Sequence, residues 1–80
     1  MKYPQIALEN GVQGKVFVQF VVEKDGSVSN IKVVRGVDAS LDKEAVRVVS
    51  VMPKWKPGKQ RGKAVRVAYT LPIAFQIGSY

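Results

Sequence analysis

The sequence predicts an α+β domain, arranged α-β-β-α-β, with a three-stranded antiparallel sheet of order 2-1-3 and two helices packed on one face. Two β-rich runs flank Asp25-Gly26, the strongest short signal for a hairpin. A helical stripe of apolar residues follows, and then a third alternating run. Because 80 residues suffice for one small domain, we expect residues 1–80 to form a single domain.

The first helix is short. Pro4 suits a first helical turn and Asn10-Gly11 is a stop signal, so one or two turns are expected between them. The hairpin follows. Residues 15–24 carry apolar side chains at both parities, which favours a central strand. The second strand loses its alternation near Ser29-Asn30, which predicts a bulge or twist there.

The second helix is predicted from Leu41 to Met52. Its apolar residues recur at helical spacing, Ser40 is a suitable N-cap, and Pro53 ends it. A basic loop over residues 54–63 is expected next, with Pro57-Gly58 as its turn.

The last strand is predicted over residues 64–75. Six apolar or aromatic residues share one face, and Pro72 confines the strand to an edge or a bulge. This strand could pair with the second strand or lie beside the first; the two-sided apolar character of the first strand favours the latter. The last strand then has an open edge, which can bind an extended segment of a partner.

Enzymatic function is not expected. The chain has no Cys and no His, which removes thiolate chemistry and the commonest general base and metal ligand. Asp42 and Glu44 point different ways on a helix and are interpreted as helix-start charges. No cofactor and no metal are predicted, and no apolar run approaches the roughly 18–20 residues that span a bilayer.

The net charge of +7 is unevenly distributed, because no acidic residue follows Glu44. Such a basic segment favours an anionic partner, namely nucleic acid, lipid headgroups or an acidic protein; a solvated basic loop is the alternative. Nucleic acid is the least expected partner. Gly11 to Gly14 resembles a GXXG loop but leads into a strand, and Phe17 alone makes a poor stacking platform.

Three aromatic residues have two interpretations each. Trp55 could be an exposed anchor, but a ring that caps the core is favoured. Tyr69 shares the parity of Val65 and Val67, which favours the core over an interface. Tyr3 could pack or bind.

The motif series resembles the C-terminal domain of the TonB family of energy transducers over nearly the whole chain. The motifs are Tyr3-Pro4, GxVxVxF from Gly14 to Phe20, Asp25-Gly26, Leu41-Asp42, KWxPG from Lys54 to Gly58, and Pro72-Ile73 with Phe75. The resemblance implies that residues 1–80 are a single periplasmic domain, excised from a longer protein. That protein would be anchored in the inner membrane of a Gram-negative bacterium through a Pro-rich spacer. It implies binding to the TonB box of outer-membrane receptors by strand addition. Proton-motive force, delivered through inner-membrane proton-channel partners, would then drive uptake of nutrients such as siderophores.

Carried onto this chain, the resemblance implies a partner-binding site. The charge of the basic loop predicts a steering surface beside it. The binding residues are Lys2, Tyr3, Ala64, Val65, Arg66, Val67, Ala68, Tyr69 and Thr70. The steering residues, which attract an acidic partner, are Lys54, Lys56, Lys59, Arg61 and Lys63. Two alternatives remain: a sensing or wall-binding module of another membrane protein, such as an antibiotic-sensing peptidase, and a nucleic-acid-binding module. A homodimer of the isolated domain is also expected, because an open edge can pair with a copy of itself.

Overall fold

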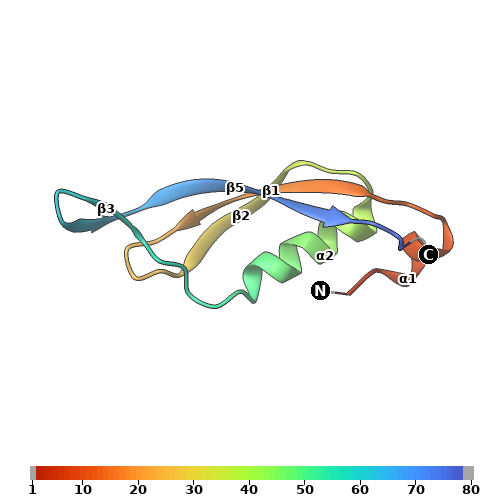
Figure 1. Cartoon of the computed structure of the whole chain (residues 1–80), viewed down its shortest axis with the longest axis horizontal. Coiled ribbons are helices and arrows are strands. Elements are labelled where there is room, and N and C mark those ends of the chain that lie inside the picture. Colours follow the sequence, from red (N-terminus) through yellow and green to blue (C-terminus); the bar gives the residue numbers. More distant parts are fainter. Residues whose placement is uncertain (1, 79–80) are drawn as a thin grey trace.

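The computed structural model describes residues 2–78 and has seven elements (Figure 1). In chain order they are α1 (Gln5–Glu9), β1 (Gly14–Val22), β2 (Val28–Arg35), α2 (Ala39–Ser50), β3 (Gly58–Gln60), β4 (Lys63–Val65) and β5 (Val67–Phe75). The molecule is elongated, with principal extents of 49 × 24 × 16 Å. Among these residues no helix has the length and apolar character needed to span a membrane.

The main sheet has three antiparallel strands in the order β2-β1-β5, and both helices lie on the same side of it (Figure 1). The predicted fold class, strand order and helix placement are therefore confirmed. β1 is the central strand, and its neighbour β5 pairs with it over the whole length from Gly14↔Phe75 to Val22↔Val67. Within residues 2–78, no helix lies on the other face of the sheet (Figure 1).

The hairpin between β1 and β2 forms at Asp25-Gly26, as predicted. Gly26 has φ +88°, a left-handed conformation that favours glycine, and Asp25 accepts a hydrogen bond from the Ser27 backbone at 2.9 Å. The expected irregularity also occurs: the register shifts between Gln19 and Val21, and Asn30 on the opposing strand has φ 51°. This bulge explains why apolar residues of β2 change parity.

The core lies between the sheet and α2. Alternate residues of β1 point into it, as period two requires, and α2 contributes residues at helical spacing. The buried apolar residues are Ala7, Val16, Val18, Phe20, Val22, Leu41, Ala45, Val49, Ile73 and Phe75.

The start of α2 differs from the prediction. Asp38, rather than Ser40, is the N-cap, and its carboxylate accepts from the Ser40 backbone N–H at 3.0 Å. Ser40 lies inside the helix and donates its hydroxyl to the same carboxylate. Asp and Ser are comparable caps, so the two positions could not be ranked from residue type alone.

The basic segment also differs from the predicted loop. Gly58 begins β3 instead of forming a turn with Pro57, and β3 pairs with β4 as a two-stranded arm at one end of the molecule (Figure 1). The turn of this arm lies at Arg61-Gly62, where both residues have positive φ, 52° and 78°. Two positive φ values in succession are typical of a two-residue type I′ hairpin.

Candidate partner-binding edge

The outer side of β5 is the open edge of the main sheet. β5 is the terminal strand, and no strand among residues 2–78 pairs with its other side. Such an edge presents a row of unpaired backbone groups that can bind another extended chain.

Pro72 indicates which backbone groups of β5 point outward. In an antiparallel pair each residue directs its N–H and C=O to one side, and consecutive residues alternate. Pro72 pairs with Phe17 inside a continuous register but has no N–H, so its position fits one whose backbone groups point away from β1. Ala68, Thr70 and Ala74 share its parity. The outward donors are therefore the N–H groups of these three residues, with a gap at Pro72.

The open edge begins later than the sequence suggested. The strand expected over residues 64–75 is divided at Arg66: Ala64 and Val65 belong to β4 and pair with Lys59 and Gly58 of the arm. Their own chain therefore occupies one side of them. Of the predicted edge residues, Val67 to Thr70 lie on the open strand.

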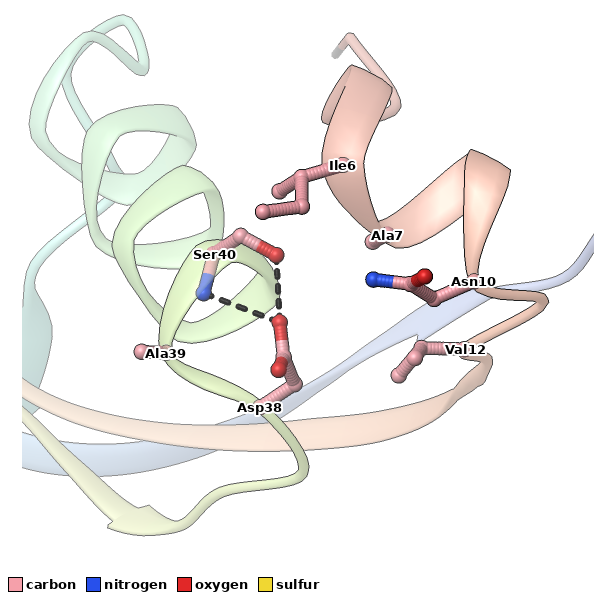
Figure 2. Close-up of a pocket in the computed structure, with 7 residues that line it drawn as sticks. All are labelled: Ile6, Ala7, Asn10, Val12, Asp38, Ala39 and Ser40. Atoms are coloured by element: carbon pink, nitrogen blue, oxygen red, sulfur yellow. Dashed lines mark hydrogen bonds between the residues drawn. The ribbon is translucent and has the colours of Figure 1, made fainter.

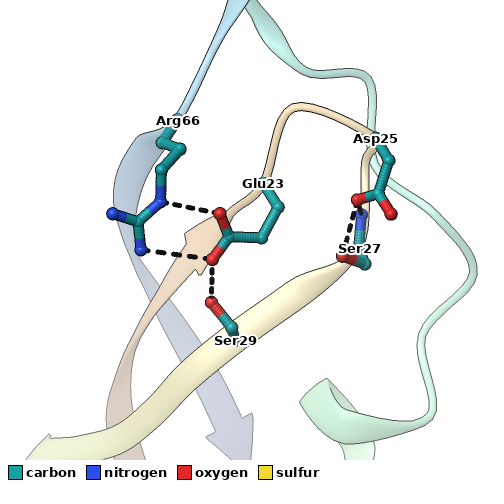
Figure 3. A network of polar contacts seen from close by, with 5 residues as sticks. All are labelled: Glu23, Asp25, Ser27, Ser29 and Arg66. Atoms are coloured by element: carbon teal, nitrogen blue, oxygen red, sulfur yellow. Dashed lines mark hydrogen bonds and ion pairs between the residues drawn. The ribbon is translucent and has the colours of Figure 1, made fainter.

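Arg66 connects this division to the β1–β2 turn (Figure 3). Its guanidinium forms a bidentate ion pair with Glu23, with Nε–Oε1 and Nη2–Oε2 distances of 2.6 and 3.2 Å, and Ser29 donates its hydroxyl to the same carboxylate. The hydrogen bond from Arg66 is the main reason that the pKa of Glu23 lies below its ordinary value. Arg66 is thus engaged within the domain, and we interpret it as a support of the edge.

An aromatic shelf borders the edge on the helix-bearing face. Tyr69 and Trp55 are stacked, with ring centroids 5.8 Å apart, and Phe20 lies behind both at 6.1 and 5.1 Å. Phe20 is fully buried and Trp55 is partly buried, so the Trp55 ring caps the core as the favoured interpretation held. Tyr69 is 38% exposed, which corrects its assignment to the core.

Lys2 and Tyr3 lie at the far end of β5 from Val67. The Tyr3 ring meets Phe75 edge-on at 5.7 Å, and its hydroxyl donates to the Val12 carbonyl. The Lys2 backbone N–H donates to Glu44 at 2.8 Å. Hydrogen bonds from Arg47 and from Lys2 lower the pKa of Glu44 from 4.5 to about 2. The structure therefore does not bring this pair together with the residues from Val67 to Thr70.

The predicted steering residues are all exposed. Lys59, Arg61 and Lys63 belong to the arm or its turn, and Lys54 and Lys56 flank Trp55. Lys24, which the sequence did not single out, joins Arg61 and Lys63 around a shallow surface hollow of about 470 Å³.

A second hollow, of about 210 Å³, lies between α1 and the start of α2 (Figure 2). The carboxylate in it, Asp38, is already used to cap α2. No group of three or more potential metal-ligating side chains occurs among residues 2–78. The edge of β5 is therefore the strongest candidate site in the described part of the chain.

Comparison with known proteins identifies the family. The family model described as "Gram-negative bacterial TonB protein C-terminal" matches residues 1–77. The chain belongs to this family. It is 32% identical over 77 residues to Protein TonB of Pseudomonas aeruginosa and, over the same length, 32% identical to Protein TonB of Yersinia enterocolitica. These matches cover 94% and 95% of this chain but 22% and 28% of the relatives, so the chain spans about a quarter of their length.

Solved structures of TonB C-terminal domains have the same fold. The solution structure of the Pseudomonas aeruginosa domain matches with a TM-score of 0.72 at 28% identity, covering 99% of this chain and 80% of that one. The Helicobacter pylori domain of residues 179–285 matches with the same TM-score and identity, covering 99% and 71%. TonB C-terminal domains are non-enzymatic interaction domains, in agreement with the absence of Cys and His.

Proposed function

We propose that this TonB C-terminal domain is the periplasmic coupling domain of an energy transducer and that it binds the N-terminal TonB box of an outer-membrane receptor by strand addition at β5. The observation that carries this proposal is the unpaired outer side of a nine-residue terminal strand in a domain of this family. Main-chain pairing makes few demands on the sequence of the bound segment, which suits one transducer that serves several receptors.

The affinity of such an edge is modest. Each main-chain hydrogen bond contributes about 0.5–1.5 kcal/mol net, and the outward donor row of β5 is interrupted at Pro72. Binding is therefore expected to be reversible, as a cycle of capture, pulling and release requires.

The basic arm supports the same function through long-range attraction. Its cations lie at one end of an elongated molecule, next to the beginning of the open edge. An acidic receptor segment would be attracted to this end before it pairs, and salt would weaken the attraction.

The N-terminal segment supports a mechanical role. Work from the inner membrane would enter the domain through its N-terminal side, delivered by proton-channel partners to the anchored part of the protein. Lys2 is bound to Glu44 of α2, and Tyr3 packs on Phe75 at the end of β5. The Tyr3 contact joins the entering segment to the strand that would hold the receptor, and the Lys2 contact joins it to α2, so we assign Lys2 and Tyr3 to the transmission of force.

Titration of the isotope-labelled domain with receptor N-terminal peptides tests this function. Amide shifts are expected at Val67 to Thr70, and a peptide of the same length with proline at alternate positions, which lacks the N–H groups needed for pairing, should produce weaker ones. Shifts that avoid these residues would show that the mechanism is wrong.

The same edge can also pair with a second copy of the domain, which would compete with receptor binding. Sedimentation over a range of concentrations tests this: a dimer should dissociate as receptor peptide is added, whereas a monomer at every concentration would rule out the competition.

A further inference from the structure

The two faces of β5 differ at the open edge. On the uncovered face the strand presents Ala68, Thr70 and Pro72, and on the helix-bearing face it presents Val67, Tyr69 and Leu71. A strand added beside β5 would place alternate side chains on these two faces. The uncovered face offers only small side chains, whereas the helix-bearing face offers the ring of Tyr69.

Burial along β5 is graded on the helix-bearing face. Phe75 is fully buried and Ile73 is 8% exposed, whereas Tyr69 is 38% exposed. The exposed ring is not loosely placed, because Trp55 stacks on it at 5.8 Å and the buried Phe20 supports both. An aromatic side chain that is held by ring contacts and partly exposed at the rim of a sheet can receive one further apolar side chain.

The pairing of an added strand with β5 would bring the peptide side chain opposite Tyr69 close to the Tyr69 ring. Since the outward backbone groups are those of Ala68 and Thr70, Tyr69 lies between them at a position that does not bond outward. In an antiparallel addition, residues opposite such a position have Cα atoms about 4.5 Å apart and their side chains in close contact.

We propose that the shelf of Tyr69 and Trp55 selects the bound segment and sets its register: the partner is an extended peptide with a branched apolar side chain facing Tyr69. This rests on the proposed strand addition at β5. The side chains at the flanking positions of the peptide face Ala68 and Thr70 and are not selected for size. The site therefore distinguishes partners by every second residue of the peptide, namely those on the same face as Tyr69.

A double-mutant cycle tests the proposal. The probes are the blocked peptide Ser-Thr-Val-Thr-Val-Thr-Ser and the same peptide with both valines replaced by alanine. The domain variants are Tyr69→Thr, which keeps a strand-forming residue without the ring, and Gln19→Thr as a control on the uncovered face, at the β1 position that pairs with Thr70. Dissociation constants come from amide shifts, and Trp55, the only tryptophan, reports on the shelf by its fluorescence.

The native domain should bind the valine peptide about three- to fivefold more tightly than the alanine peptide, as expected for a cross-strand apolar pair. Tyr69→Thr should remove this preference, and Gln19→Thr should keep it. Two results would refute selection by the shelf: Tyr69→Thr retains the full preference for the valine peptide, or the native domain shows no preference although the amides of Ala68 and Thr70 still shift. In either case the proposal of strand addition at β5 would remain. If no peptide shifts Ala68 or Thr70 in any variant, the proposed function fails as well.

Discussion

Proline substitution at outward positions of β5 should abolish partner binding without unfolding the domain. The double variant Ala68→Pro/Thr70→Pro removes the two outward N–H groups that precede Pro72. Neither N–H is expected to bond to β1, and Pro72 itself shows that proline is accommodated at this parity. The stability of the free domain should therefore change little.

The magnitude follows from the lost bonds. Two main-chain hydrogen bonds at about 0.5–1.5 kcal/mol each amount to about 1–3 kcal/mol of binding free energy. This corresponds to a dissociation constant weakened from about fivefold to more than a hundredfold. Isothermal titration with a receptor N-terminal peptide measures the loss, and chemical denaturation measures the stability.

The matched control is Leu71→Pro, at the parity that faces β1. Leu71 pairs with Val18, so this proline removes a bond of the ladder and should lower the unfolding free energy by about 1–3 kcal/mol. The reasoning is refuted if the double variant binds as tightly as the native domain, or if it loses as much stability as Leu71→Pro.

Three further predictions concern the surroundings of the edge. The pKa of Glu44 is lowered to about 2, so its ionised carboxylate stabilises the fold above pH 4.5, and this contribution is lost as the pH falls toward 2. Glu44→Gln should therefore lose less thermal stability than the native domain between pH 5 and pH 2. An unchanged pH profile of the melting temperature would contradict this. Gly26→Ala should lower the unfolding free energy by about 1–3 kcal/mol, because φ is +88° and the new Cβ would clash with the Trp55 carbonyl oxygen. Gly62→Ala is the control, since Gly62 has a similar φ of +78° but open space around it; equal losses in denaturation curves would argue against the clash. Replacing Lys59, Arg61 and Lys63 by Ser should lower the association rate constant for acidic peptides at low salt and leave the dissociation rate constant unchanged. A stopped-flow association rate that is insensitive to these replacements would exclude steering by the arm.

Period-two alternation, a DG turn and a proline near the end of the chain were sufficient to predict the sheet order and the open strand. These signals are local: Asp25-Gly26 favours a hairpin, and Pro72 confines the last strand to an edge or a bulge. The central place of β1 followed from apolar residues at both parities.

The remaining features depend on tertiary contacts or on rare conformations. The arm escaped prediction because its turn places Arg61 in a left-handed conformation that arginine seldom adopts, within a run of lysines that resembles a loop. Tyr69 has the same parity as the buried Phe75 but is 38% exposed, a difference in tertiary surroundings that a period of two does not encode. Lys2 and Tyr3 were grouped with the edge by family resemblance, whereas the fold places them at its other end.

Amide hydrogen exchange on β5 tests the central claim most directly. In the free domain, at a concentration where it is monomeric, the N–H groups of Ala68 and Thr70 should exchange rapidly and those of Tyr69 and Leu71 slowly. Saturation with a receptor N-terminal peptide should protect Ala68 and Thr70 and leave the other two unchanged. Protection of Ala68 and Thr70 already in the free domain, or no change on binding, would contradict the account.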